Sequence, residues 1–335
     1  MSQSRPTISL CMIVKNEQQH LARCLDSVEG VVDELVVVDT GSEDTTPQIA
    51  AAHGAQLIRH RWQDDFSKAR NAGLERATSD WILVLDADEE LEPVSRAALR
   101  QVVASTNADG LICVQRSLTA LGELQRYDDL SITRLFRNRP DHRYEQPIHE
   151  QIRPSIERHG GRIEQTELII LHHGYAQRTA QGKDLRAIRN LRILEKALER
   201  SPDDPYLHYQ LGATYKSLRN NELAHRHLQR AARLDHRTLE PDVQDRLYMK
   251  LAQLALGDER YAEAIEWANS SLKRNPNNWT SEYVAGVAHM FLGDIRAAYS
   301  RFTRLREEGA SALSTPDELD TVLRYCRNAL GSGAR

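Results

Sequence analysis

The feature that most constrains the fold is the alternation, from Ile8 to about Leu85, of short apolar runs with single helix-like segments. Four runs rich in Val, Ile and Leu read as buried strands, at residues 7–14, 33–40, 55–62 and 80–87. Helix-like segments separate them, at residues 16–28, 45–54 and 64–78. Strands separated by single helices predict a mostly parallel α/β sheet that helices cover on both faces.

The pattern changes twice after this region. Strand candidates at residues 111–118, 131–138 and 167–175 are less regular, and they predict a mixed or antiparallel second half of the same domain. After Gly182 the chain is helical to about Leu330. We therefore expect an α/β domain over residues 1–180 and an all-α domain over residues 181–335.

The helical part contains an internal repeat. Small residues recur at two positions in three aligned copies, at Gly212, Ala252 and Gly286 and at Ala224, Ala264 and Ala298. The second and third copies are 34 residues apart at both positions. With the further matches Leu211, Tyr215, Tyr261 and Pro276, this part resembles tetratricopeptide repeats, whose paired helices form a surface for a protein or peptide partner or a second copy. An ordinary helical bundle is the alternative.

Composition excludes some classes of function. The chain has 44 basic and 48 acidic residues, so it lacks the positive field expected of a nucleic-acid-binding protein. No apolar run approaches the length of a membrane-spanning helix, and the first residues do not resemble a secretory signal. Four scattered cysteines indicate inert thiols in a reducing compartment, and we expect a cytoplasmic protein.

A group of acids follows the strand candidate at residues 80–87: Asp86, Asp88, Glu89 and Glu90. Carboxylates this close repel one another unless a cation lies between them. Asp86 and Asp88 would point to opposite faces of an extended strand, so they converge only if the strand breaks into a turn. Such a turn suits Mg²⁺ or Mn²⁺ carrying diphosphate oxygens. For Glu89 and Glu92 we favour a simpler role, as acids that begin the next helix.

Other sites with similar signatures fit less well. An EF-hand requires Gly and Glu where Leu91 and Ala97 stand, and a zinc protease requires His at Arg153. The chain has no P-loop and no dinucleotide fingerprint. A phosphatase with Asp86 as nucleophile remains an alternative, although Glu90 stands where that class usually has Thr or Val.

Three blocks, "ISLCMIVKNEQQHLARCLDSV", "ELVVVDTGSEDTTPQIA" and "FSKARNAGLERATSDWILVLDADEEL", resemble the nucleotide-sugar half of a family 2 glycosyltransferase with the GT-A fold. The resemblance covers residues 7 to about 92. It implies an inverting, metal-dependent hexosyltransferase that uses a nucleotide-diphosphate sugar, for which we expect a UDP-sugar, and an acceptor such as a protein, a peptide or a cell-envelope glycan. The alternative from another class is a repeat scaffold with an inactive transferase domain.

The resemblance also implies roles for individual residues. Donor contacts are expected from Val14, Glu17, Asp39, Arg70, Asn71 and Asp86. Metal ligands are expected to be Asp88, Asp86 and a late histidine, His173. Thr40 replaces the second acid of the family's V-D-D-G-S motif, and for Glu17 and Arg70 a surface ion pair is the alternative. An I-H-E segment recurs in repeat-bearing members, so His149 and Glu150 match it, and Glu150 is the expected general base.

Overall fold

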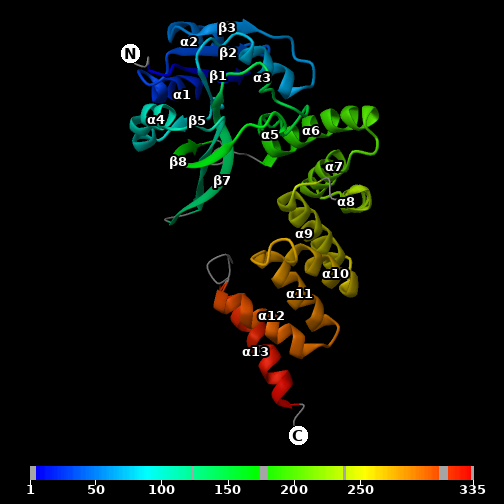
Figure 1. The fold of residues 1–335 in the computed structure, drawn as a ribbon. Helices are drawn as coiled ribbons and strands as arrows, with labels where there is room; N and C mark the ends of the chain where they lie inside the picture. The colour runs from blue at the N-terminus through cyan, green and yellow to red at the C-terminus, as the bar shows by residue number, and fades with distance from the viewer. Residues whose placement is uncertain (1–4, 122–123, 174–179, 237–238, 309–315, 333–335) are drawn as a thin grey trace. The chain divides into compact units, whose positions relative to one another are not determined.

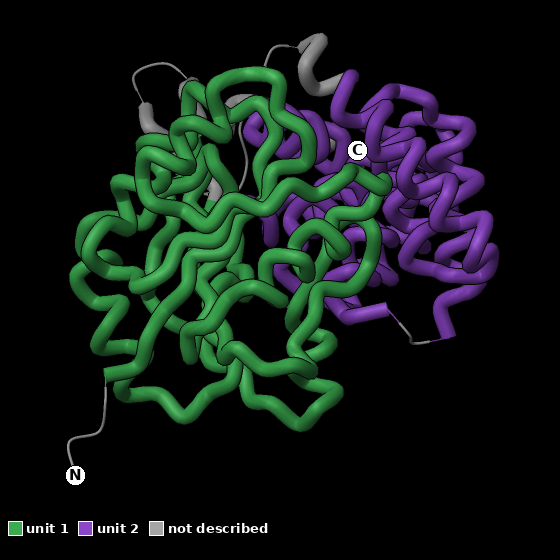
Figure 2. The backbone as a smooth tube through the Cα atoms, turned by 90° about the horizontal axis from the view of Figure 1, so that it is seen from above, with its two compact units in different colours: residues 1–183 green, residues 184–335 purple. Residues whose placement is uncertain are grey.

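The computed structural model describes residues 5–121, 124–173, 180–236, 239–308 and 316–332. The chain forms two compact units, Met1–Lys183 and Asp184–Arg335, coloured separately in Figure 2. The first unit is an α/β structure, and the second is helical (Figure 1).

The first unit is built on a sheet of eight strands in the order β3-β2-β1-β4-β7-β6-β8-β5. These strands are β1 (Ile8–Val14), β2 (Glu34–Asp39), β3 (Gln56–Arg59), β4 (Trp81–Val84), β5 (Glu89–Leu91), β6 (Gly110–Leu121), β7 (Leu124–Arg137) and β8 (Ile163–His172). The first four in this order are parallel, as predicted. Beyond β4 the sheet is mixed, because β7 and β5 run antiparallel to their neighbours while β6 and β8 are parallel. This confirms the prediction for the less regular segment.

Helices cover both faces of this sheet. They are α1 (Leu21–Val28), α2 (Thr46–Ala52), α3 (Phe66–Leu74), α4 (Pro93–Ser105) and α5 (Arg153–Arg158). Successive side chains of β1 point to opposite faces. Leu10 and Met12 join a hydrophobic core with α1, α2 and α4, whereas Cys11 joins a second core with Leu74 of α3 and Ile156 of α5. The sheet is therefore the middle layer of three.

Two helices of this unit begin directly after an acidic residue that caps them. The Asp65 carboxylate accepts a hydrogen bond from Lys68 N at 3.1 Å and caps α3. The Glu92 carboxylate accepts one from Ser95 N at 2.9 Å and caps α4. The expectation for Glu92 is confirmed.

The helical unit consists of consecutive helices that pack in pairs. They are α6 (Ala180–Arg200), which begins in the first unit, α7 (Pro205–Ser217), α8 (Asn221–Leu234), α9 (Pro241–Gly257), α10 (Tyr261–Leu272), α11 (Trp279–Phe291), α12 (Ile295–Glu308) and α13 (Pro316–Ser332). The predicted close approach within pairs is confirmed. A Cβ at Gly212 would lie 2.5 Å from Leu228 Cγ, and one at Gly286 would lie 2.7 Å from Phe302 Cε1. In the described part of the chain, no helix is both long enough and apolar enough to cross a membrane.

The contact between α11 and α12 predicts a measurable cost for Gly286→Ala. The added methyl group overlaps the buried ring of Phe302, so we expect the free energy of unfolding to fall by about 1–3 kcal/mol. Urea unfolding followed by circular dichroism measures the change. The control is Gly257→Ala, because a Cβ there meets no atom within 4 Å and favours the helix by up to about 1 kcal/mol. Equal stability of the two variants would contradict the packing described.

Candidate active site

The candidate site lies at the edge of the sheet where the parallel strands end. Val14 and Asp39 are paired in register at the ends of β1 and β2, and β4 ends on the other side of β1. Ligands of open α/β sheets bind at this edge. The loops that follow β1, β2 and β4 carry most of the residues that the sequence singled out.

The loops after β1 and β2 are joined by hydrogen bonds. Asp39 is 6% exposed, and its Oδ1 accepts from both the backbone and the hydroxyl of Ser42, at 2.9 and 2.6 Å. The Ser42 hydroxyl also accepts from Asn16 N at 3.0 Å, and Glu17 N donates to Thr46 Oγ1 at 2.7 Å. Val14 lies in the hydrophobic core, and its carbonyl accepts from Thr40. Val14 thus contributes backbone position rather than a side chain facing a ligand.

The chain turns directly after β4, as expected for Asp86 and Asp88 if their carboxylates are to converge. Glu89 N donates to Asp86 O at 2.9 Å, which closes a turn over Asp86, Ala87 and Asp88. The expectation for Glu89 was wrong, because it begins β5 rather than a helix and its side chain is 0% exposed. Its burial is possible because Arg134 donates to Glu89 Oε1 at 2.7 Å, and a buried carboxylate requires such a partner.

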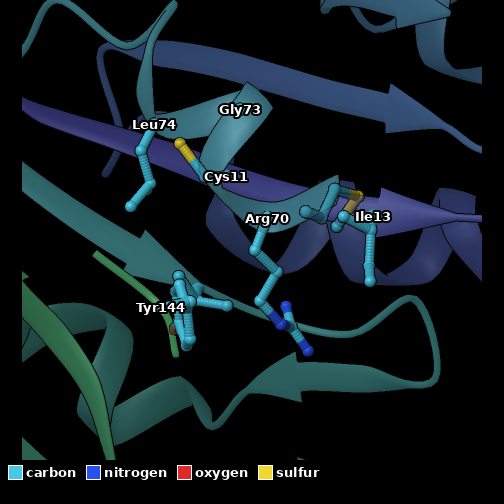
Figure 3. A pocket seen from close by; sticks show the side chains of 8 residues that line it. Cys11, Ile13, Arg70, Gly73, Leu74 and Tyr144 are labelled. Carbon is cyan, nitrogen blue, oxygen red and sulfur yellow. The ribbon is translucent and has the colours of Figure 1, made fainter. Parts of the chain in front are cut away.

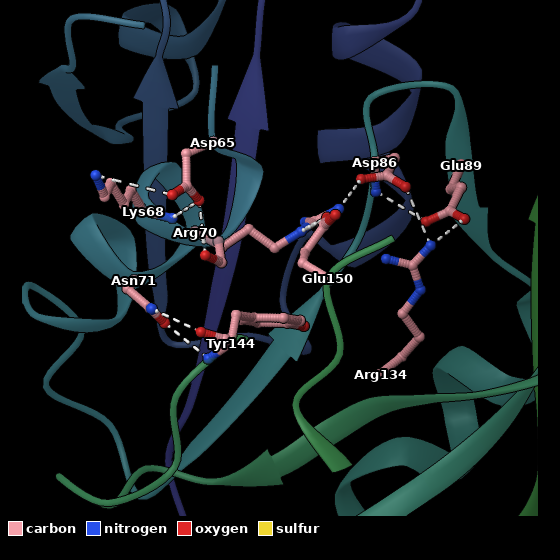
Figure 4. A network of polar contacts seen from close by, with 10 residues as sticks. Asp65, Lys68, Arg70, Asn71, Asp86, Glu89, Arg134, Tyr144 and Glu150 are labelled. Carbon is pink, nitrogen blue, oxygen red and sulfur yellow. Dashed lines mark hydrogen bonds and ion pairs between the residues drawn. The ribbon is translucent and has the colours of Figure 1, made fainter. Parts of the chain in front are cut away.

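Arg70 joins Asp86, an expected donor contact, to the candidate base Glu150 (Figure 4). From α3, its Nη2 donates to Asp86 Oδ1 at 2.8 Å and its Nε donates to Glu150 Oε1 at 2.6 Å. The side chain is 10% exposed, and its guanidinium lies 5.5 Å from the ring centroid of Tyr144. Arg70 Nη1 is buried and finds no hydrogen-bond partner among the described residues.

Arg134 of β7 was not singled out by the sequence, although it completes this network (Figure 4). Its Nη2 donates to Asp86 Oδ2 at 3.1 Å as well as to Glu89. Burial raises the pKa of Asp86, but Arg70 and Arg134 outweigh it and hold this pKa well below its usual range. With both oxygens of Asp86 bonded to guanidinium groups, the carboxylate is poorly placed to attack a phosphate, so the geometry disfavours the phosphatase alternative.

The segment that carries the candidate base is fixed to α3. Asn71 Nδ2 donates to Tyr144 O at 3.0 Å, and Tyr144 N donates to Asn71 Oδ1 at 2.9 Å. Asn71 therefore positions this loop. Glu150 is 11% exposed at its side chain, and its Oε2 accepts no hydrogen bond from any residue that the structure describes. His149 has a left-handed backbone, with φ of 53°.

A small and mainly apolar pocket lies beside Arg70 (Figure 3). It is lined by Cys11, Met12, Ile13, Arg70, Gly73, Leu74, Val84 and Tyr144. Such a lining supports the aliphatic part of Arg70 but offers few partners for a diphosphate.

The structure places the imidazole of His172, and not that of His173, beside the Asp88 carboxylate, although His173 N donates to Asp88 O at 2.9 Å. His172 Nε2 lies 3.3 Å from Asp88 Oδ2, whereas His173 Nε2 lies 3.1 Å from Glu90 Oε1. Neighbouring side chains at a strand end point to opposite sides, so only one of the two can face Asp88. Burial raises the pKa of Asp88, but the hydrogen bond and charge of His172 outweigh it and the pKa is lowered.

The residues present fit a metal that takes few protein ligands. Among the described residues, no group of three or more His, Cys, Asp or Glu side chains could enclose an ion. Asp88 is 26% exposed and ionised at neutral pH, and Asp86 is 36% exposed. A magnesium-type ion in proteins often takes one or two carboxylates and completes its shell with substrate phosphates and water. Asp88, with His172 beside it, is a residue that could hold such an ion.

The chain is similar to several known proteins. Residues 9–169 match the sequence model of glycosyl transferase family 2, and residues 193–226 and 245–278 match tetratricopeptide repeat models. The chain is 41% identical over 272 residues to a TPR repeat-containing protein of Synechococcus elongatus, covering 77% of this chain and 66% of that protein. It is 28% identical over 203 residues to the SPbeta prophage-derived glycosyltransferase SunS of Bacillus subtilis, covering 60% and 47%.

Among solved structures, S. aureus TarS residues 1–349 in complex with UDP-GlcNAc aligns with a TM-score of 0.47 and 13% identity, covering 81% of this chain and 92% of that one. The chain spans about half to two thirds of the length of the two curated relatives above. The predicted architecture, a GT-A-type α/β unit followed by helical repeats, is confirmed. Residues 9–169 of this chain therefore belong to glycosyl transferase family 2, and tetratricopeptide repeats follow them.

Proposed function

We propose that the chain transfers a hexose from a nucleotide-diphosphate donor, for which a UDP-sugar is the first candidate, to an acceptor hydroxyl with inversion at the anomeric carbon. The observation that carries this proposal is the bridge from Asp86 through Arg70 to Glu150. It brings an acid of the donor motif and a candidate base to one edge of the sheet, although they are 64 positions apart in the sequence.

Each residue of the cluster has a part in this proposal. Glu150 would accept the proton of the acceptor hydroxyl as the new glycosidic bond forms and the bond to the diphosphate breaks. Its Oε1 is held by Arg70, so Oε2 is the oxygen available for that proton. Asp39, Glu17 and the backbone near Val14 would bind the nucleoside, at the ends of β1 and β2.

A divalent cation, Mn²⁺ or Mg²⁺, would be held by Asp88, with Asp86 and His172 close by. When bound, it would stabilise the charge on the departing diphosphate. Arg70 Nη1, which has no partner among the described residues, is a donor that a diphosphate oxygen could satisfy.

We propose that the helical repeats bind a protein or peptide, as acceptor or as partner, or a second copy of the chain. A surface of stacked helix pairs suits an extended polypeptide. A cell-envelope glycan is the other acceptor class.

The donor is identified by a thermal-shift screen of UDP-, GDP- and dTDP-sugars with and without Mn²⁺. We expect one donor to raise Tm only when Mn²⁺ is present, and we expect Asp88→Asn to abolish that rise because the neutral amide is a poor ligand for a hard cation. Asp26→Asn, at a side chain 67% exposed on α1, is the control that should keep the response. If no donor shifts the wild-type protein, the transferase proposal fails.

Glu150→Gln distinguishes a role of Glu150 in proton transfer from a role in donor binding. The amide oxygen of Gln can still accept from Arg70 Nε, but it cannot take a proton, so kcat should fall by about 10²–10⁴-fold while the donor KM changes little. Release of nucleoside diphosphate, with water as the acceptor, is the assay. Glu157→Gln, which alters an exposed acid of α5, is the matched control. Turnover at the wild-type rate in Glu150→Gln would remove Glu150 as the base.

A further inference from the structure

Glu89 is the most deeply buried acid of the cluster, and three donors surround its carboxylate. Oε2 accepts from Asp86 N at 2.8 Å, and Oε1 accepts from Arg134 Nη2 at 2.7 Å and from Gln115 Nε2. The side chain is 0% exposed, so it cannot touch a substrate. The hydrogen bonds that it accepts all come from other residues of the protein.

These contacts close the turn that carries the metal-site acids. The Glu89 backbone donates to Asp86 O, and the Glu89 side chain accepts from Asp86 N, so residues 86 and 89 are bonded twice. The turn leads from β4 into β5, where Glu89 pairs with His172 of β8. The buried Glu89 side chain thus holds Asp86, while the Glu89 backbone pairs with the strand that carries His172, the neighbour of Asp88.

Arg134 links Glu89 to the Asp86 carboxylate. Its Nη2 is shared between Glu89 Oε1 and Asp86 Oδ2, and its side chain is 6% exposed. Glu89 therefore orients the guanidinium that holds Oδ2 of Asp86. Arg70 holds the other oxygen from a different element.

We propose that Glu89 and Arg134 are positioning residues of the donor and metal site, which orient Asp86 and aim Asp88 without touching substrate. The proposal rests on the function proposed above. It assigns Arg134 to the orientation of Asp86 rather than to direct contact with the diphosphate.

Glu89→Gln is a sharp test because all three partners of this carboxylate are donors. Whichever way the amide turns, its NH₂ group faces a donor, so at least one contact is lost. Hydrogen exchange measured by mass spectrometry should show faster exchange of the amides of residues 86–89, with β1 and β2 unchanged. Unchanged exchange over residues 86–89 would overturn the proposal whether or not the chain is a transferase.

The second readout is the Mn²⁺ concentration that half-saturates donor binding, measured by thermal shift with the donor found in the screen. Loss of groups that orient a metal ligand typically weakens metal affinity about 10–100-fold, so we expect a rise of this size in Glu89→Gln. A purely structural role would lower Tm without moving this concentration. An unchanged value therefore overturns the proposal.

Two further variants make the result interpretable. Removing one partner of a buried ion pair can unfold a protein, whereas replacing both with apolar residues is often tolerated. Glu89→Met with Arg134→Met should therefore fold and show the same rise in half-saturating Mn²⁺. Asp129→Asn, which breaks the exposed Arg116 pair in the same β6–β7 hairpin, should show no rise. If the wild-type chain binds no donor with Mn²⁺, the proposed function fails, while the exchange result still decides whether Glu89 holds the turn.

Discussion

Two guanidinium groups hold three carboxylates together at the carboxyl edge of the sheet, and the geometry of the candidate site depends on this arrangement. Arg70 comes from α3, Arg134 from β7, and the acids come from the turn after β4, from β5 and from the loop before α5. Each contact joins segments distant in the sequence. The network therefore fixes the relation between the parallel and the mixed parts of the sheet as well as the position of Asp86.

The sequence predicts those parts of the site that depend on local pattern. Asp86 and Asp88 follow a buried strand and lie in a turn, which was expected because in an extended strand they would point to opposite faces. The helix that presents Arg70 lies within the predicted residues 64–78. Glu89 could not be assigned correctly in this way. An acid before a helix is typical of a helix start, and the burial of Glu89 depends on a cation, Arg134, that stands 45 positions later. The choice between His172 and His173 likewise depended on the strand register, which no short motif specifies.

The helical unit was predicted in more detail because its constraint is periodic. Small residues at repeated positions indicated where paired helices approach, and Gly212 and Gly286 lie within contact of Leu228 and Phe302. In a repeat, the same contact between paired helices recurs in each copy and leaves a regular spacing of small residues in the sequence. The contacts of the candidate site occur once and leave no such spacing. This difference explains why the sequence predicted the repeats but not the role of Arg134, which lies on an irregular strand and belongs to no motif.

The charge of the cluster bears on the need for a metal. Among the described residues, the cations paired with Asp86, Glu89 and Glu150 are Arg70 and Arg134, which leaves one negative charge. Asp88 adds another. A nucleotide diphosphate would bring further negative charge to the same edge, and like charges in a partly buried site repel strongly. Arg70 Nη1 can donate to one phosphate oxygen, but its charge is already shared between Asp86 and Glu150. A donor that carries its own divalent cation would reverse this repulsion, with Asp88 as the partly exposed acid that receives the cation.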